Sequence, residues 1–367
     1  MLGRMKEVDL ELNKLDFDQL WKGFSKSHYA LYNDEIVIIS GSSGVDLELA
    51  PLESFFVGKV DERFIGNTSV LLGNTYVAIF SEDYIGEDMT SGKLASLIVH
   101  EMFHSFQLRT GEKRFSDEIL GMDYPFTAEN MGLRMMEREY LLAASTEGNL
   151  EKKKENLSHF YSLRRVREKL LGEHIDYEKA LESIEGAAVY VEYKALIQMK
   201  TEKKRDIFES FTRDFAMVGE DKFLIRASSL AQGLLLCLLA EELMPGWESR
   251  FSHSEEYLSD CIKEGLGIKI SARKYKYKNQ TLVDKMLQGW KENRDVLFKD
   301  FESKKENSLE EGFRISGFDP MHILKRDKQI LHLNFLRINI GGQDRMIKGP
   351  VKMIIGEHFF DVKKIEW

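Results

Sequence analysis

Cysteine, proline and excess positive charge are scarce in this 367-residue chain. The two cysteines, Cys237 and Cys261, cannot make the disulfide framework of a small secreted protein, so we expect a reducing, cytoplasmic location. Only 5 prolines are present, and we find no proline-rich linker. The net charge of −9 disfavours a general nucleic-acid-binding protein, because such proteins are usually basic.

Long apolar runs are also missing. The most apolar stretch, Gly233–Ala240, lies between Gln232 and Glu241 and is far shorter than the roughly 20 residues that span a bilayer. We therefore expect no membrane span and interpret this stretch as part of a buried core helix. The first residues of the chain do not contain the apolar segment of a secretory signal, which agrees with the expected cytoplasmic location.

The N-terminal part of the chain is predicted to be rich in strands after one short helix. The expected strands are short and rich in β-branched or aromatic residues: Glu35–Ser40, Phe55–Val60, Ser69–Leu72 and Thr75–Phe80. A Gly-Asn pair separates the last two segments, which predicts a β-hairpin.

From about Ser91 the pattern becomes helical, and after Gly312 it alternates again like strands. The expected C-terminal strand segments are Ile330–Ile340, Gly349–Gly356 and His358–Trp367. The fold class is therefore α+β. The expected domains are a β-rich subdomain (1–90), a helical core (91–250), a helical extension (251–311) and a C-terminal all-β unit (312–367).

The segment LIVHEMFHSFQ places His100, Glu101 and His104 in a helix that is apolar nearly all round. Such a helix is buried, and buried charge needs a partner. Residues four apart project about 40° apart on a helix, so both imidazoles can face one metal ion. This is the HExxH arrangement of zinc hydrolases, in which the glutamate takes a proton from a metal-activated water. The alternative is two satisfied core histidines beside a surface glutamate, and the apolar flanks disfavour it.

A catalytic zinc site needs a third protein ligand. No further histidine follows at the spacing of the Met-turn class, which is therefore excluded. Glu185 and Glu192 are the best candidates, because they nearly share one face of a predicted helix with small and apolar neighbours. They lie about 10.5 Å apart along the axis, so we expect only one of them to bind the ion.

The residues that follow Glu185 favour it as the ligand. Gly186 and the two alanines after it thin the helix, and we expect the histidine helix to approach most closely there. Glu192 is then expected to accept a hydrogen bond beside the site. In the alternative interpretation, Glu185 is an ordinary exposed helical residue.

The two motifs, LIVHEMFHSFQ and IEGAAVYVEY, resemble the HExxH…EGxAxYxE pattern of bacterial peptidase-like proteins in the gluzincin superfamily. The resemblance covers roughly Thr75–Met244. It implies a zincin-like middle with one zinc held by His100, His104 and Glu185, and with Glu101 as general base. It also implies that the strand Thr75–Phe80 lines the cleft, where an edge strand can hold an extended peptide.

The chain departs from the thermolysin-like pattern at one position. Those members carry an acid four residues after the ligand glutamate, where this chain has Val189. A carboxylate that orients a histidine must then come from elsewhere, and Glu192 and Glu129 are the candidates. The candidate donors to a developing oxyanion are Tyr190, Tyr193 and Arg226, each of which is otherwise a packing or surface residue.

The sequence therefore predicts a zinc metallopeptidase that acts on a peptide or protein substrate. Two alternatives stay open: a catalytically silent zincin-fold protein that binds a peptide, and a zinc hydrolase of a non-peptide amide or ester. The presence of Glu101 argues against the first alternative, because a binding module does not need the base.

Overall fold

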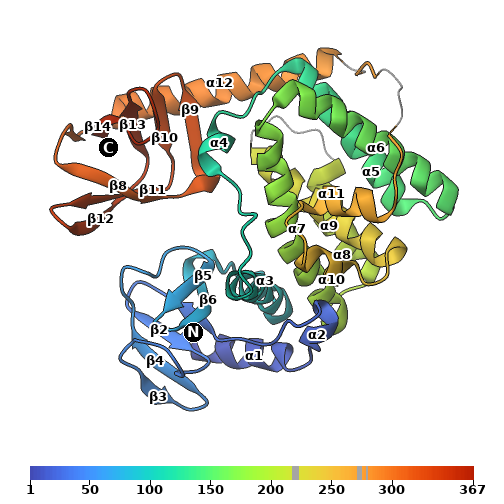
Figure 1. Ribbon diagram of the computed structural model, residues 1–367. Helices are drawn as coiled ribbons and strands as arrows, with labels where there is room; N and C mark the ends of the chain where they lie inside the picture. The colour runs from blue at the N-terminus through green and yellow to red at the C-terminus, as the bar shows by residue number, and fades with distance from the viewer. Residues whose placement is uncertain (217–222, 271–274, 278–279) are drawn as a thin grey trace.

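The computed structural model describes residues 1–216, 223–270, 275–277 and 280–367. It has an N-terminal sheet, a helical middle and a C-terminal unit of antiparallel strands, which is the α+β class that the sequence predicts. In Figure 1 the two strand-rich parts lie on the left, one above the other, and most helices lie on the right. The chain thus places helices between, and beside, two separate β units.

The N-terminal part begins with α1 (Leu2–Leu12) and α2 (Phe17–Leu20), followed by a six-stranded sheet of order β3-β4-β2-β1-β6-β5. The strands are β1 (Tyr29–Tyr32), β2 (Ile36–Ile39), β3 (Ala50–Leu52), β4 (Phe55–Lys59), β5 (Thr68–Leu72) and β6 (Thr75–Ser81). The predicted hairpin is β5–β6, and Gly73 occupies its turn with φ 63°, a conformation that favours glycine. The strands β1 and β3 were not predicted, and β1 pairs with β6 in parallel.

The prediction that Thr75–Phe80 is an edge strand is wrong. This segment is β6, which pairs with β1 on one side and with β5 on the other. The edge strand at this end of the sheet is β5, the first strand of the hairpin, which pairs with β6 and covers it. Ser69 of β5 and Ser105 share a hydrogen bond between their hydroxyl oxygens, 2.6 Å apart, so this edge lies against the next helix.

That helix, α3 (Ser91–Arg109), carries the HExxH segment. Thr90 caps it, because the side chain accepts a hydrogen bond from the Lys93 amide at 3.2 Å. The helix is buried by the N-terminal sheet and by α7 (His174–Met199), which runs antiparallel to it. The sequence thus places its two motif helices side by side.

The remaining helices complete the middle of the molecule. They are α4 (Glu118–Met122), α5 (Ala128–Thr146), α6 (Leu150–Leu171), α8 (Lys204–Ala216), α9 (Phe223–Leu243), α10 (Trp247–Ser252), α11 (Leu258–Gly265) and α12 (Gln280–Lys304). The apolar stretch Gly233–Ala240 lies in α9 and packs into the main core, as expected. No helix in the described part of the chain is long and apolar enough to cross a membrane.

A buried ionic network joins α5, α6, α7 and α9. Arg164 donates to Glu137 and to Glu182, at 2.5 and 2.7 Å. The charged members are almost fully excluded from solvent: Arg134, Glu137, Arg164, Arg167, Glu178 and Glu182. Because buried charges are tolerated only when they are paired, the network fixes how these helices fit together. The sequence did not reveal it, since each member alone resembles a charge on a solvated helix face.

The C-terminal unit contains two antiparallel sheets of order β7-β14-β13-β10-β9 and β12-β11-β8. The strands are β7 (Ser308–Leu309), β8 (Phe313–Phe318), β9 (Ile323–Arg326), β10 (Gln329–His332), β11 (Phe335–Ile340), β12 (Gln343–Lys348), β13 (Val351–Ile355) and β14 (Val362–Glu366). The segment predicted as one strand, Ile330–Ile340, is divided between β10 and β11. This unit is tied to the helices by α4, whose Ile119 and Met122 pack against its core.

Candidate metal centre

The two histidines of the motif face the same side of α3. Their Nε2 atoms lie 3.1 Å apart, and their rings are nearly perpendicular. Both rings are largely buried, with 13% and 16% of their side-chain surface exposed for His100 and His104. The four-residue spacing therefore converges two ring nitrogens on one point, as predicted.

Glu185 of α7 supplies a third atom to the same point. Its Oε2 lies 3.6 Å from His100 Nε2 and 3.5 Å from His104 Nε2. One ligand atom from each of these three residues can be chosen so that all lie within 4.8 Å of one another. The carboxylate of Glu185 thus points between the two imidazoles.

Gln107 orients His104 and ties the motif helix to α7. Its side-chain carbonyl Oε1 lies 2.8 Å from His104 Nδ1, and its Nε2 donates to the Ile184 carbonyl at 3.0 Å. If His104 Nδ1 carries the proton, Nε2 presents its lone pair toward Glu185. The sequence analysis missed Gln107, although its place three residues after His104 on the same helix was a usable signal.

Glu192 lies on the other side of His100. Its Oε2 is 3.3 Å from His100 Nδ1, and its Oε1 accepts a 2.8 Å hydrogen bond from Lys93. The seven-residue spacing from Glu185 brings both carboxylates to α3, one beside each nitrogen of His100. Glu192 therefore occupies the place expected of a carboxylate that orients a histidine.

Glu129, the other candidate for that place, does not lie there. It is exposed in the first turn of α5. An acidic side chain at that position interacts favourably with the positive end of the helix dipole. The prediction for Glu129 is therefore wrong.

Arg226 of α9 reaches the site through Glu185. Its guanidinium donates to Glu185 Oε1 at 2.8 Å and to Glu118 at 2.6 Å. Tyr177 also donates to Glu118, at 3.2 Å. Arg226 was predicted as a donor to an oxyanion, but both of these contacts are to carboxylates, and one of them holds Glu185 in place. Glu118 was not predicted, since 108 residues separate it from Arg226 along the chain.

The two tyrosines predicted as oxyanion donors lie in aromatic packing. Tyr190 is fully buried, and its ring contacts Trp21 and Trp247 with centroids 6.2 and 5.7 Å apart. Tyr193 packs on Phe211. For Tyr190 the cause is helical geometry: it lies five residues after Glu185, so its side chain points about 140° away from that of Glu185 around the helix. The prediction for these two residues is wrong.

The close helix approach at Gly186 is also not the one predicted. An added Cβ at Gly186 would lie 2.5 Å from the Cα of Gly233, so the glycine lets α7 approach α9 rather than α3. Gly233 makes the reciprocal contact, because a Cβ there would lie 2.4 Å from the Glu182 carbonyl oxygen. The glycine is needed for the position of α9, which in turn carries Arg226.

The site favours positive charge. Burial disfavours the imidazolium form of His100, but Glu185 and Glu192 outweigh this effect and raise its pKa to about 10. Burial likewise opposes ionisation of Glu185, yet His104, His100 and Arg226 hold its pKa well below the usual range. Burial raises the pKa of Glu101, against the opposing effect of the two histidines. The carboxylates that stabilise a proton on the imidazoles would also stabilise a cation bound at the same place.

The donor set fits zinc. Two imidazole nitrogens and one carboxylate oxygen are the ligands of one common class of catalytic zinc site, which leaves a position open for water or substrate. With Gln107 beside one Nδ1 and Glu192 beside the other, both Nε2 lone pairs can face the same point. Three electron-rich atoms then converge, and a cation between them removes their mutual repulsion.

Glu101 differs from the three converging residues. No hydrogen bond or ion pair to its carboxylate is found within the residues that the structure describes, and it follows His100 directly on α3. A partly buried carboxylate with a raised pKa can accept a proton from a neighbouring group. The arrangement thus separates a set of ligating atoms from one free base.

Comparisons with known proteins add no relative: no family model matches the chain, and no curated protein or solved structure is similar to it.

Proposed function

We propose that the protein is a zinc-dependent hydrolase that cleaves peptide bonds. The observation that supports this most directly is the convergence of His100, His104 and Glu185. Glu101 follows His100 on the same helix, and its carboxylate has no partner among the described residues. The HExxH spacing and the buried carboxylate from a second helix are the features that the resemblance to gluzincins requires. The two free, buried cysteines agree with a reducing, cytoplasmic location.

His100, His104 and Glu185 would hold the metal in this proposal. When bound, zinc polarises a water molecule and the substrate carbonyl. Glu101 accepts the proton of the attacking water and delivers it to the leaving amine. Gln107 and Glu192 would orient the imidazoles through their Nδ1 atoms, and Arg226 keeps one oxygen of Glu185 turned toward them.

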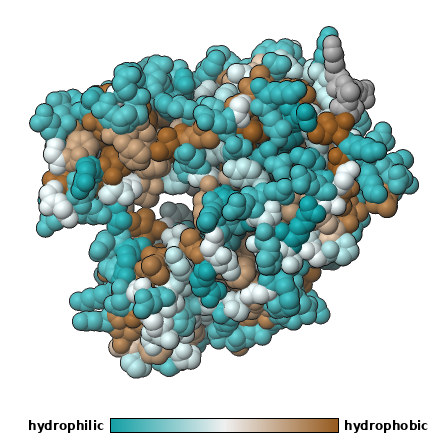
Figure 2. Space-filling model, viewed as in Figure 1, coloured by the Kyte–Doolittle hydropathy of each residue, from teal (hydrophilic) through white to brown (hydrophobic). Residues whose placement is uncertain are grey.

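The substrate is proposed to lie between the two β units. Figure 2 shows the surface hollowed on the left, between the C-terminal unit above and the N-terminal sheet below. The edge strand β5 lies against α3, and no strand in the described part of the chain pairs with its outer side. An extended peptide can pair with such an edge, which favours a peptide over a small amide or ester.

A digest of a mixed peptide library tests this proposal. The zinc-loaded protein should cleave peptides, and the Glu101→Gln variant should bind zinc but not cleave them, because the amide cannot accept the proton. A matched control is Glu129→Gln, which changes an exposed glutamate and should retain activity. Zinc binding without cleavage of any peptide, together with cleavage of ester or simple amide substrates, would show that the substrate class is wrong. Zinc binding with no hydrolysis at all would favour a binding protein.

A further inference from the structure

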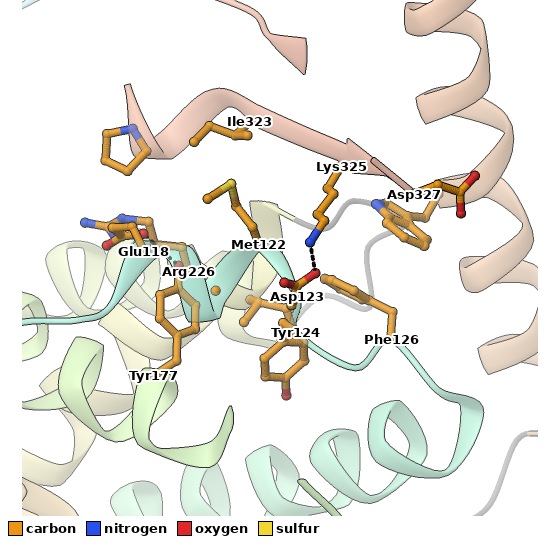
Figure 3. A pocket seen from close by; sticks show the side chains of 14 residues that line it. Glu118, Met122, Asp123, Tyr124, Phe126, Tyr177, Arg226, Ile323, Lys325 and Asp327 are labelled. Carbon is orange, nitrogen blue, oxygen red and sulfur yellow. Dashed lines mark hydrogen bonds and ion pairs between the residues drawn. The ribbon is translucent and has the colours of Figure 1, made fainter. Parts of the chain in front are cut away.

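A cavity of 360 Å³ lies between the helical middle and the C-terminal unit. This size is near the lower end of small-ligand pockets, which are about 300–1,000 Å³. One wall is α4 with the loop after it, and the opposite wall is β9 (Figure 3). Glu118 and Arg226 lie at one end of the cavity, and Phe126 and Asp327 lie at the other.

The cavity adjoins the candidate metal centre. Arg226 lines the cavity and also donates to Glu185, whose second carboxylate oxygen faces the histidines. Arg226 therefore belongs to both the wall of the cavity and the surroundings of the metal centre. A peptide whose cleaved carbonyl lies at the histidines would have a neighbouring side chain on the side of Arg226, toward the cavity.

The lining suits an aromatic group. The rings of Phe126 and Trp290 are stacked, with centroids 4.7 Å apart and planes inclined by 20°. Met122 and Ile323 contribute apolar surface from opposite walls. Aromatic rings pack favourably on the edges and faces of other rings, and methionine adapts its shape to them.

The polar groups of the lining favour an occupant that carries an uncharged hydrogen-bond acceptor. Glu118 is paired with Arg226, and Asp123 forms an ion pair with Lys325 that Figure 3 marks. Two buried donors, Arg226 Nε and Trp290 Nε1, have no hydrogen-bond partner in the described part of the chain. Buried donors without acceptors are costly, so an occupant that brings carbonyl oxygens is favoured. A peptide supplies such oxygens beside its side chain.

We propose that this cavity binds an aromatic side chain of the peptide substrate, close to the cleaved bond. The C-terminal unit then belongs to the substrate-binding site, because β9 forms one of its walls. This inference rests on the proposed peptidase function and narrows its substrate class. It also explains the two contacts of α4. One side of this helix packs on the C-terminal core, and the other side presents Glu118 to Arg226.

Binding is tested apart from catalysis, with the zinc-loaded Glu101→Gln protein and two blocked amino acids. N-acetylphenylalanine amide should bind at least about tenfold more tightly than N-acetylalanine amide, measured by ligand-observed NMR titration. The Met122→Trp variant fills the cavity and should abolish this preference. The control Met346→Trp makes the same substitution at a 47% exposed position of the C-terminal unit and should keep it.

A second variant covers the case in which Met122→Trp does not fold. Trp290→Phe retains a stacked ring but lacks the N–H donor, and should weaken binding of N-acetylphenylalanine amide about fivefold. Equal binding of the two blocked amino acids to the Glu101→Gln protein overturns the inference. So does an unchanged preference in a folded Met122→Trp protein or, if that variant does not fold, an unchanged affinity of Trp290→Phe for N-acetylphenylalanine amide.

Cleavage assays separate this inference from the proposed function. For the wild-type protein, peptides with phenylalanine near the cleaved bond should have a KM at least about tenfold lower than their alanine counterparts. If the aromatic preference in binding is found but no peptide is cleaved, the peptidase function fails and the cavity assignment stands. If peptides are cleaved without an aromatic preference, the cavity assignment fails and the function stands.

Discussion

Arg226 holds one oxygen of the Glu185 carboxylate at 2.8 Å, while the other oxygen faces the two motif histidines at 3.5 and 3.6 Å. One oxygen of the Glu185 carboxylate is thus bound by Arg226, and the other is left to face the histidines. This fixes the direction of the free oxygen, and a metal ligand whose direction is fixed costs less to order on binding.

Replacement of this arginine should therefore weaken the metal site. We expect Arg226→Met to lower zinc affinity by about 10- to 100-fold, the range typical of partners that orient a ligand. Competition with a chromogenic chelator measures the affinity. Lys325→Met is the matched control, because Lys325 is also a cation of the cavity wall but pairs with Asp123. Equal affinities for the two variants would contradict the role of Arg226.

Glu192 and Glu129 provide a paired test of the carboxylate that orients His100. Glu192→Gln should reduce zinc affinity by about 10- to 100-fold, because the amide lacks the charge that favours the Nδ1–H tautomer. Glu129→Gln should leave the affinity unchanged, since that side chain is exposed on α5. The same chelator competition is suitable. A loss with Glu129→Gln that equals the loss with Glu192→Gln would contradict the assignment.

The glycine pair between α7 and α9 makes a prediction about stability. Gly186→Ala should destabilise the protein by about 1–3 kcal/mol, the usual cost of overpacking, because the new Cβ would lie 2.5 Å from the Gly233 backbone. Gly3→Ala in α1 is the control, since nothing lies within 4 Å of its added Cβ. Urea unfolding measures both. If Gly186→Ala unfolds at the same urea concentration as Gly3→Ala, the helices are not as close as described.

The lowered pKa of Glu366 predicts how the stability of the protein depends on pH. Burial opposes ionisation of this residue, but Lys352 and Lys305 outweigh it and lower the pKa of Glu366 to about 2. An unfolded glutamate has a pKa of about 4.3. Because the folded pKa is the lower one, the stabilisation is complete above about pH 5 and is lost as pH falls through the window from about 4.3 to 2.

The measurement is the difference in free energy of unfolding between the wild-type protein and Glu366→Gln, followed by urea unfolding from pH 7 to pH 3. The wild-type advantage should be constant near neutral pH and should shrink below about pH 4.3. Glu310→Gln, which changes an exposed glutamate of the same unit, should show little difference at any pH. A wild-type advantage that grows toward low pH would contradict the ion pairs of Glu366.

Local sequence signals predicted the elements that carry the site. The Gly-Asn pair predicted the β5–β6 hairpin, and the change of pattern near Ser91 predicted the start of α3. Helical periodicity was sufficient to place Glu185 and Glu192 on one face of α7, which in the structure meets the histidine helix. These features depend on residues within two helical turns or one hairpin of each other, and the physics that fixes them is local.

Features that depend on contacts between distant segments could not be predicted. The choice of α9 as the partner of Gly186 depends on a second glycine, Gly233, whose place beside it follows only from the packed helices. Arg226 could be selected as a polar residue near the site, but its attachment to Glu185 and Glu118 depends on the position of α4. The edge position of β5 depends on strand order, and β1 was not visible as a strand.

The zinc content of four purified proteins tests the central claim most directly, by elemental analysis after dialysis against zinc-free buffer. We expect about one zinc per chain in the wild type and in Glu101→Gln, because Glu101 is a base and not a ligand. We expect the metal to be lost from the double variant His100→Ala/His104→Ala and from Glu185→Ala, since two protein ligands rarely hold a catalytic zinc. Full zinc retention in the double variant would contradict the account, as would loss from Glu101→Gln with retention in Glu185→Ala.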